Sequence, residues 1–345
     1  MAKIRRILIT GGAGYVGAVL VPKLLAKGYE VRVLDLYLFG DKLWEDLKDK
    51  SGLEEIKGDM RDLELVRRAV QGSDAVIHLA CISNDPSFEL NPALGRSVNY
   101  DCFAPLVELS KEAGVRRFIY ASSSSVYGIS DKKDVTEDHP LHPLTDYSRY
   151  KMLCEPVLLR AQSRDFIATV LRPATVCGYS PRLRLDLTIN ILTNHAVTNG
   201  KIRVFGGKQL RPNIHIEDLT DLYIQLMEFP EEKIQGKIYN AGYENHSVQQ
   251  LAEIVRKVVS QRVAERKNLV IETTPTDDER SYHISSEKIR RELGFVPKRT
   301  IEDAVSDLVD AFQAGRIPHP MTDIRYYNIR TMQQSDLLLD LSKTR

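Results

Sequence analysis

A short run rich in β-branched residues, Ile4 to Thr10, leads directly into the glycine-rich segment Gly11 to Gly17. The segment satisfies both Gly12-x-Gly14-x-x-Gly17 and the wider Gly11-x-x-Gly14-x-x-Gly17 spacing. Glycines at these intervals permit a tight turn from a strand into a helix, and they let the backbone and the helix N-terminus approach a pyrophosphate. The sequence therefore predicts a dinucleotide-phosphate site at the first strand-to-helix turn.

Further short β-branched runs follow through the first half of the chain, and segments of helical period separate them. These predicted strands are Glu30 to Leu34, Leu53 to Lys57, Asp74 to Leu79, Arg116 to Ala121 and Ile167 to Leu171. Strands joined by helix-length connections form right-handed crossovers and a parallel sheet that is covered on both faces. We therefore expect a doubly wound parallel α/β fold.

The pattern loosens after about residue 175. We expect a cofactor-binding domain over residues 1–175, with later segments around 212–242 returning to it. Residues 176–325 would form mainly a smaller C-terminal α/β lobe for substrate, and 326–345 a C-terminal tail. Ser247 followed by Gln250 has the form of a capping box and predicts a helix start in the smaller lobe.

Composition narrows the possible partners. The chain has 48 Lys and Arg against 47 Asp and Glu, a formal charge of +1, so it lacks the basic excess that nucleic-acid binding requires. Its apolar runs are far shorter than the roughly 20 residues that span a bilayer. The four cysteines are scattered singly, which fits reduced thiols better than disulfides or a metal site. We expect a cytoplasmic protein without a metal.

Two carboxylates follow predicted strands at the same edge of the sheet. Asp35 ends the second strand, where it can accept hydrogen bonds from the adenosine ribose, although a solvated strand-end acid is the alternative. A carboxylate there repels a 2′-phosphate, which favours NAD over NADP. Asp59 can reach the adenine amino group, whereas Asp62 is better placed to cap the next helix.

Tyr147 and Lys151 lie four residues apart and share one face of a predicted helix. A lysine ammonium near a phenol, with a nicotinamide cation close by, lowers the pKa of the phenol toward working pH. Tyr147 can then act as a general acid and base. A tyrosine and lysine at this spacing are usually surface residues, and the glycine motif is what favours catalysis here.

Together these motifs resemble the extended short-chain dehydrogenase/reductase family, in particular its NAD-dependent nucleotide-sugar epimerase and dehydratase branch, over most of the chain. The matching segments are TGGAGYVG (Thr10 to Gly17), Asp35, GDMRD from Gly58, HLA (His78 to Ala80), Val98 with Asn99, ASSSSVYG (Ala121 to Gly128), Tyr147 with Lys151, LRPATVCG (Leu171 to Gly178) and RPNIHIEDL (Arg211 to Leu219). The resemblance implies a Rossmann-like fold and NAD as cofactor.

The resemblance also implies roles for individual residues. Ser123 would hydrogen-bond the reacting oxygen beside Tyr147. Arg211, Arg280 and Asn190 would hold the diphosphate of a nucleotide-sugar substrate. His215 is expected to be structural. The residues implied to contact the cofactor are Gly11, Gly14, Tyr15, Val16, Gly17, Asp35, Asp59, Met60, Leu79, Ala80, Ser83, Asn99, Tyr147 and Lys151.

Departures from the family pattern guide the choice of reaction. The 4,6-dehydratases of this branch carry acidic side chains after the catalytic hydroxyl residue, where this chain has Ser124 and Ser125. Thr175 replaces an asparagine of many 4-epimerases, and the loop over residues 179–184 is unusually basic. The leading hypothesis is a nucleotide-sugar 4-epimerase that works through a transient 4-keto sugar.

Two other functions stay open at this point. A net reductase of nucleotide-keto-sugars shares every motif, and a cofactor-sensing binding protein is an alternative from another class, although such a protein needs no Tyr147, Lys151 and Ser123 together. By the same resemblance we expect a homodimer paired through the helices around Pro105 to Ala113 and Lys151 to Arg160.

Overall fold

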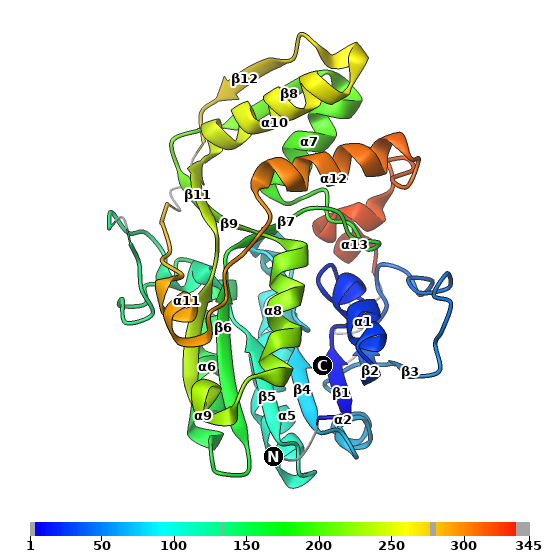
Figure 1. Cartoon of the computed structure of the whole chain (residues 1–345), viewed down its shortest axis with the longest axis vertical. Helices are drawn as coiled ribbons and strands as arrows, with labels where there is room; N and C mark the ends of the chain where they lie inside the picture. The colour runs from blue at the N-terminus through cyan, green and yellow to red at the C-terminus, as the bar shows by residue number, and fades with distance from the viewer. Residues whose placement is uncertain (1–3, 133, 277–280, 336–345) are drawn as a thin grey trace.

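The computed structural model describes residues 4–132, 134–276 and 281–335. Its centre is a seven-stranded parallel sheet in the order β10-β6-β5-β4-β1-β2-β3 (Figure 1). The strands are β1 (Arg6–Thr10), β2 (Glu30–Asp35), β3 (Leu53–Lys57), β4 (Ala75–His78), β5 (Arg117–Ala121), β6 (Ile167–Pro173) and β10 (Lys237–Ala241). All six predicted runs form strands of this sheet, which confirms the doubly wound α/β fold.

Side chains of β1 show why the sheet needs a helical layer on each face. Ile7 and Ile9 pack into one hydrophobic cluster, whereas Leu8, between them, packs into another, and all three are fully buried. Because neighbouring residues of a strand point to opposite faces, both faces of the sheet are covered. On one face lie α1 (Gly17–Ala26) and α8 (Ile216–Glu228); on the other lie α2 (Leu63–Val70), α5 (Phe103–Glu112) and α6 (Asp146–Ala161).

The smaller lobe lies beyond one end of this sheet, at the top of Figure 1. It contains a three-stranded sheet in the order β11-β9-β7 and the parallel pair β12-β8, and its helices bury a third hydrophobic cluster. Its elements are β7 (Thr175–Cys177), α7 (Thr188–Asn199), β8 (Lys201–Phe205), β9 (Leu210–His215), β11 (Glu244–Ser247), α10 (Val248–Arg262), β12 (Val270–Thr274) and α12 (Ile301–Gln313).

Short elements complete the described chain. These are α3 (Asp85–Glu89), α4 (Pro92–Arg96), α9 (Glu231–Ile234), α11 (Glu287–Leu293) and α13 (Asn328–Gln334), with single turns at Ser97–Asp101, Ser124–Tyr127, Ala264–Arg266 and Ile324–Tyr326. The chain returns to the large sheet through β10, and α11 then packs against β10. The expected tail is helical over α13, where Asn328, Thr331 and Met332 are buried.

Local capping patterns are reproduced as the sequence predicts. Ser247 and Gln250 form the capping box that begins α10, and the Asp62 carboxylate accepts hydrogen bonds from the first turn of α2. Pro22 lies inside α1, and Gly28 follows that helix with a φ of +84°. These ends depend on neighbouring residues only, which is why sequence patterns predict them.

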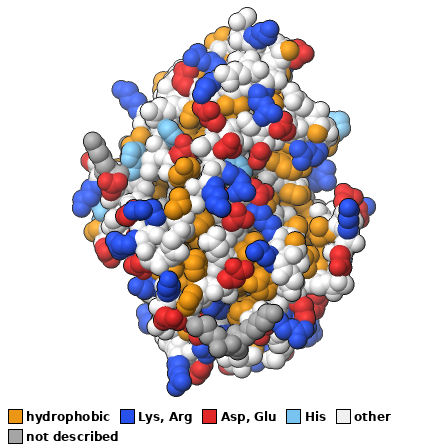
Figure 2. All heavy atoms as spheres, in the orientation of Figure 1, with side chains coloured by type: hydrophobic (Ala, Val, Ile, Leu, Met, Phe, Trp, Pro, Cys, Tyr) orange, Lys and Arg blue, Asp and Glu red, His pale blue; other side chains and the backbone are white. Residues whose placement is uncertain are grey.

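The surface carries mixed charge. On the face in Figure 2, blue Lys and Arg side chains alternate with red Asp and Glu side chains. No helix among the described residues is both long and apolar enough to cross a membrane.

The start of α1 generates a stability prediction. A Cβ at Gly17 would lie 2.1 Å from the carbonyl oxygen of Gly12, so Gly17→Ala must push the turn away from the helix. We expect the free energy of unfolding to fall by about 2 kcal/mol or more, measured by denaturant titration. Gly28→Asn is the control, since a Cβ there meets nothing within 4 Å and asparagine tolerates positive φ. Equal stability of the two variants would contradict this account of the turn.

Candidate active site

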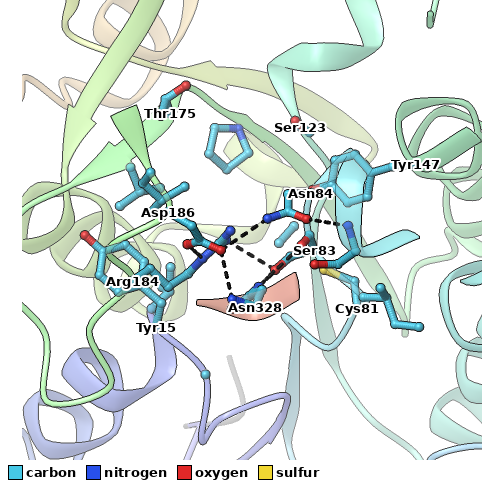
Figure 3. A pocket seen from close by; sticks show the side chains of 18 of the residues that line it. Tyr15, Cys81, Ser83, Asn84, Ser123, Tyr147, Thr175, Arg184, Asp186 and Asn328 are labelled. Atoms are coloured by element: carbon cyan, nitrogen blue, oxygen red, sulfur yellow. Dashed lines mark hydrogen bonds and ion pairs between the residues drawn. The ribbon is translucent and has the colours of Figure 1, made fainter. Parts of the chain in front are cut away.

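A cleft of about 640 Å³ opens where the carboxyl ends of the parallel strands face the smaller lobe (Figure 3). Its size is that of a typical small-molecule site, and ligands of doubly wound sheets bind at this edge. The expected site residues that line the cleft are Gly11, Gly14, Tyr15, Val16, Gly17, Asp35, Asp59, Met60, Leu79, Ala80, Ser83, Ser123, Tyr147, Lys151 and Arg211. The fold thus brings together residues that lie up to 200 positions apart in the sequence.

The glycine turn has no room for side chains. Gly11 has a φ of +75°, and a Cβ on it would lie 2.5 Å from the backbone of Ala80. The turn therefore packs directly on the loop that follows β4, and α1 begins immediately after it. This leaves bare backbone and a helix N-terminus facing the cleft, a surface that suits a dinucleotide pyrophosphate.

The carboxylate of Asp35 is held firmly at the end of β2. It accepts hydrogen bonds from the backbone N–H of Ala13 at 2.9 Å and of Tyr37 at 2.8 Å. Burial raises the pKa of Asp35, and the two backbone donors counteract the rise. Asp35 thus fixes the glycine turn against β2, and its ribose contact remains a prediction.

Asp59 lies in the cleft but is already engaged. The Nε of Arg61 donates to its Oδ2 at 2.9 Å, and the backbone N–H of Arg61 donates to its Oδ1 at the same distance. An adenine amino group would have to share this carboxylate with Arg61. The predicted adenine contact of Asp59 therefore has a competitor that the sequence did not indicate.

Helix α6 presents Tyr147 and Lys151 to the cleft, one turn apart. A capping box of Thr145 with Ser148 starts the helix, and the Thr145 hydroxyl donates to Asp85. The Nζ of Lys151 lies 6.0 Å from the centre of the Tyr147 ring and donates to the carbonyl oxygen of Ala121 at 2.7 Å. The lysine thereby ties α6 to the end of β5.

Ser123 follows β5 and faces the cleft on the same side as Tyr147 (Figure 3). Its Oγ accepts a hydrogen bond from the backbone N–H of Ser125 and lies 2.8 Å from the Ser125 Oγ. The Ser123 hydroxyl is thus oriented by the turn that follows it. A hydroxyl, a phenol and an ammonium group converge on one region, and such a set can transfer a proton to and from a ligand.

The surroundings of the Tyr147 phenol affect its pKa. Burial raises the pKa of Tyr147 well above its ordinary value; Cys81 and Asp85 raise it further, and Arg184 lowers it. The ammonium group of Lys151 is directed at the Ala121 carbonyl oxygen, and the joint effect of Lys151 and a bound nicotinamide on the Tyr147 pKa remains a prediction. Spacing along a helix predicts that two side chains lie close together, but it does not show which groups a lysine hydrogen-bonds.

Two asparagines that the sequence placed in the site do not line the cleft. Asn99 is buried, and its side chain pairs with the backbone N–H and C=O of Ile82. Asn190 is fully buried; its oxygen accepts from the Gly178 N–H, and its amide donates to Tyr15 and to the Arg184 carbonyl. Both side chains hold cleft-forming loops in place through these hydrogen bonds.

The two arginines expected to hold the substrate have different outcomes. Arg211 lies on β9 and lines the cleft, and its Nη1 donates to the carbonyl oxygen of Leu210 at 3.0 Å. Arg280 lies outside the described residues.

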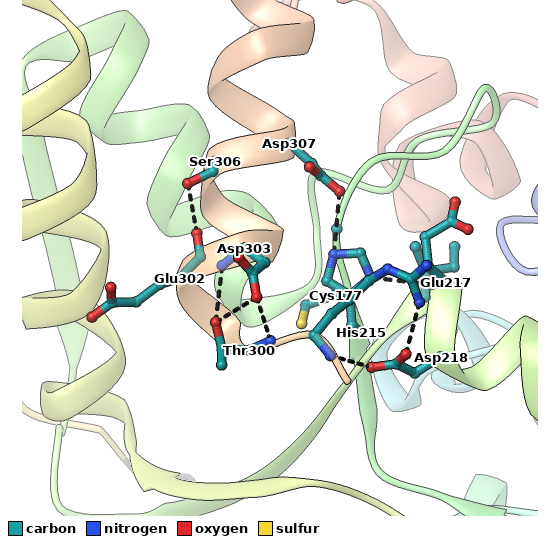
Figure 4. A network of polar contacts seen from close by, with 12 residues as sticks. Cys177, His215, Glu217, Asp218, Thr300, Glu302, Asp303, Ser306 and Asp307 are labelled. Carbon is teal, nitrogen blue, oxygen red and sulfur yellow. Dashed lines mark hydrogen bonds and ion pairs between the residues drawn. The ribbon is translucent and has the colours of Figure 1, made fainter. Parts of the chain in front are cut away.

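His215 is structural, as expected. Its ring Nδ1 accepts from the backbone N–H of Glu217 and so caps α8, while Nε2 lies 3.3 Å from Asp307 of α12 (Figure 4). Its side chain is completely buried and is not part of the cleft. His215 therefore joins the smaller lobe to α8.

Sequence reasoning missed a polar cluster between the smaller lobe and the cofactor side of the cleft. Arg184 donates to Asp186 at 2.9 Å and to the Ser83 hydroxyl at 3.2 Å. Asp186 also accepts from the backbone N–H of Asn328 on α13 at 3.0 Å. The basic character of residues 179–184 was visible in the sequence. The groups that these arginines contact, Ser83 and Asn328, lie far away along the chain.

Comparison with known proteins establishes the family. The model of the NAD dependent epimerase/dehydratase family matches residues 7–242. The chain therefore belongs to this family of NAD-dependent enzymes, and the glycine turn beside Asp35 fits that cofactor.

Individual relatives point to nucleotide-sugar chemistry. The chain is 28% identical over 325 residues to a UDP-glucose 4-epimerase of Lactobacillus helveticus, covering 87% of this chain and 95% of the relative. It resembles the crystal structure of the UDP-glucose 4-epimerase of Thermotoga maritima with UDP-glucose, at 25% identity and a TM-score of 0.78, covering 90% of this chain and 99% of that one. The fold also matches a dTDP-glucose 4,6-dehydratase of Streptomyces venezuelae with NAD bound, at 23% identity and a TM-score of 0.80, covering 91% and 99%.

The position of Asp35 predicts cofactor choice. Its carboxylate would repel a 2′-phosphate, so we expect NAD to bind at least about tenfold more tightly than NADP. Asp35→Asn should narrow this ratio, whereas Asp41→Asn, an exposed acid in the following loop, should not. Titration calorimetry with both cofactors measures the ratio, and tighter binding of NADP by the unaltered protein would refute the assignment.

Proposed function

We propose that this protein is an NAD-dependent 4-epimerase of a nucleotide-diphosphate sugar. The observation that carries the proposal is the pair Ser124 and Ser125 beside Ser123 in the cleft, where elimination of water would require an acidic group. The similarity to UDP-glucose 4-epimerases, which covers 87% of this chain, supports the same reaction.

The carboxylates of the described cleft are committed to other partners. Asp35 accepts from two backbone N–H groups, Asp59 from Arg61, and Asp186 from Arg184. Asp85 accepts from the Thr145 hydroxyl at the start of α6. This arrangement favours a reaction that needs only proton transfer at one sugar hydroxyl.

In this proposal Tyr147 takes the proton from the sugar 4-hydroxyl while the carbon gives up its hydride. The bound NAD supplies reversible hydride acceptance. Ser123 holds the sugar oxygen beside the phenol, and Lys151 provides the nearby positive charge that favours the phenolate. The 4-keto sugar turns, C4 regains the hydride on its opposite face while Tyr147 returns its proton to the oxygen, and the product differs only at C4. No net oxidation occurs.

Arg211 is proposed to bind the substrate diphosphate from β9, because a guanidinium suits phosphate oxygens. The sugar must be free to turn, so affinity should reside mostly in the nucleotide half of the substrate.

We also propose a homodimer paired through α5 and α6. These two helices pack side by side, and α6 carries the apolar residues Met152, Leu153 and Leu159, which remain half-buried within one chain. Covering them with a second copy would remove apolar surface from water.

The reaction itself is tested with a panel of nucleotide sugars. We expect interconversion of 4-epimers without net change in absorbance near 340 nm, and a loss of about 10²–10⁴-fold in turnover for Tyr147→Phe, which removes the transferable proton. NAD affinity of the variant should stay nearly unchanged. Stoichiometric change at 340 nm would instead indicate a net reductase or dehydrogenase, and full turnover by Tyr147→Phe would exclude Tyr147 as the acid and base.

Substrate orientation is tested with Arg211→Ala. Binding energy that is equal in the ground and transition states appears in KM, so we expect KM to rise about ten- to hundredfold with a smaller change in kcat. Inhibition by the free nucleoside diphosphate should weaken in parallel, and NAD affinity should persist. Arg256→Ala, an exposed arginine of α10 paired with Glu253, is the matched control. Unchanged affinity of Arg211→Ala for the nucleoside diphosphate would remove Arg211 from the site.

A further inference from the structure

The loop that follows β7 buries two arginines in the cleft. Arg182 is 4% exposed and Arg184 is 8% exposed, and both line the cavity. Arginines are almost never this buried unless their charge is compensated. Their surroundings therefore indicate what the loop is built to hold.

The hydrogen-bonding capacity of these arginines is only partly used. Arg182 stacks 3.5 Å above the ring of Phe39 and donates through Nη2 to Asn328. Within the described part of the chain, its Nε and Nη1 have no partner, and neither has Nη2 of Arg184. Three buried donors thus remain for a ligand that accepts hydrogen bonds.

Charge in this region is also unbalanced. Burial and the neighbouring Arg184 lower the pKa of Arg182 to about 9, and Asp186 and Asp35 counteract this only in part. Asp186 is shared with Arg184 and Asn328, while Asp35 is held by backbone N–H groups. An anion placed between the arginines would supply the missing negative charge.

The loop is fastened to the glycine turn through Tyr15. The Tyr15 hydroxyl donates to the carbonyl oxygen of Gly178 at 2.7 Å, and the Ser180 hydroxyl donates to the Tyr15 carbonyl at 2.8 Å. Arg182 lies at Phe39, shortly after Asp35, whereas Arg184 lies at Ser83 and influences Tyr147. Arg182 thus contacts the segment that follows β2, and Arg184 contacts the loop that follows β4, and both of these segments line the cleft.

We propose that Arg182 and Arg184 bind the pyrophosphate of the dinucleotide, as a second wall contributed by the loop after β7 and facing the glycine turn. A pyrophosphate has the acceptors and the negative charge that these buried donors lack. The proposal depends on the NAD cofactor of the family and is independent of which sugar reacts.

The C-terminal helix α13 positions this wall. Besides accepting from Arg182, Asn328 donates through its side chain to the Ser83 hydroxyl at 2.8 Å and through its backbone N–H to Asp186. Asn328 thus connects the arginine loop to the loop after β4. A cofactor that is bound by both the glycine turn and the loop after β7 should dissociate slowly. Slow dissociation suits an enzyme that reuses the same cofactor in every turnover.

Binding measurements without sugar test the proposal. Arg182→Gln and Arg184→Gln should each lower the affinity for NAD and for ADP-ribose about ten- to hundredfold, which is the range for hydrogen bonds to charged groups. Calorimetry measures both affinities. The affinity for UDP should stay unchanged. The affinity of these variants for adenosine, which has no pyrophosphate, should fall only a little. Arg117→Gln is the control for loss of a buried arginine, because Arg117 lies on β5 away from the cleft and donates to backbone carbonyls.

The positioning role of Asn328 has its own readout. Asn328→Ala should lower the NAD affinity less than Arg182→Gln does. The fold-loss of NAD affinity in the double variant should be smaller than the product of the two single fold-losses, because both residues act through one contact. Independent, multiplicative losses would show that Asn328 does not act through Arg182.

Three results would overturn the proposal. The first is an NAD affinity that is unchanged in both arginine variants. The second is an adenosine affinity that falls as much as the NAD affinity does. The third is a UDP affinity that falls while the NAD affinity stays the same. The last result would assign the arginines to the substrate. If Arg182→Gln does not fold, Arg182→Lys keeps the charge but not the fork of donors, and an NAD affinity equal to that of the unaltered protein would likewise overturn the assignment of Arg182.

Discussion

The contact between Tyr15 and the loop after β7 is the constraint on which the rest of the site depends. Tyr15 belongs to the glycine turn, yet its hydroxyl and its carbonyl oxygen both bind that loop, at Gly178 and Ser180. Asn190 completes the connection from α7 by donating to the same hydroxyl. Hydrogen bonds thus join the glycine turn to the smaller lobe, and a ligand in the cleft lies between the two.

A second buried network fixes the elements that carry Ser123, Tyr147 and Lys151 relative to one another. The Glu155 carboxylate on α6 forms an ion pair with Arg172 of β6 at 2.6 Å, with side-chain exposures of only 4% and 3%, and accepts from the Ser122 hydroxyl at 2.6 Å. Ser122 precedes Ser123, and Glu155 lies one turn after Lys151. Removing one partner of a buried pair costs about 3–5 kcal/mol, so the network holds β5, β6 and α6 together beside Ser123, Tyr147 and Lys151.

The sequence predicted what neighbouring residues decide. Strand positions, the glycine turn, the Ser247 capping box and the placement of Tyr147 with Lys151 on one helix all follow from short-range spacing, and the structure reproduces them. Whether a side chain lines a cleft or braces it is a different question. Asn99 and Asn190 stand beside cleft residues in the sequence, but each turns inward to bind backbone groups. The contact of Arg182 with Asn328 joins residues 146 positions apart, so no local pattern could indicate it.

The central claim is that hydride and proton leave and return at a single sugar carbon and its oxygen, without elimination. Turnover of a nucleotide sugar in D₂O, followed by NMR of the sugar, tests it most directly. The account predicts a mixture of 4-epimers with no deuterium on any sugar carbon, because the hydride returns from the cofactor and only the hydroxyl proton exchanges. Deuterium at C5 or C6, with loss of the 6-hydroxyl, would show a dehydratase and contradict the account.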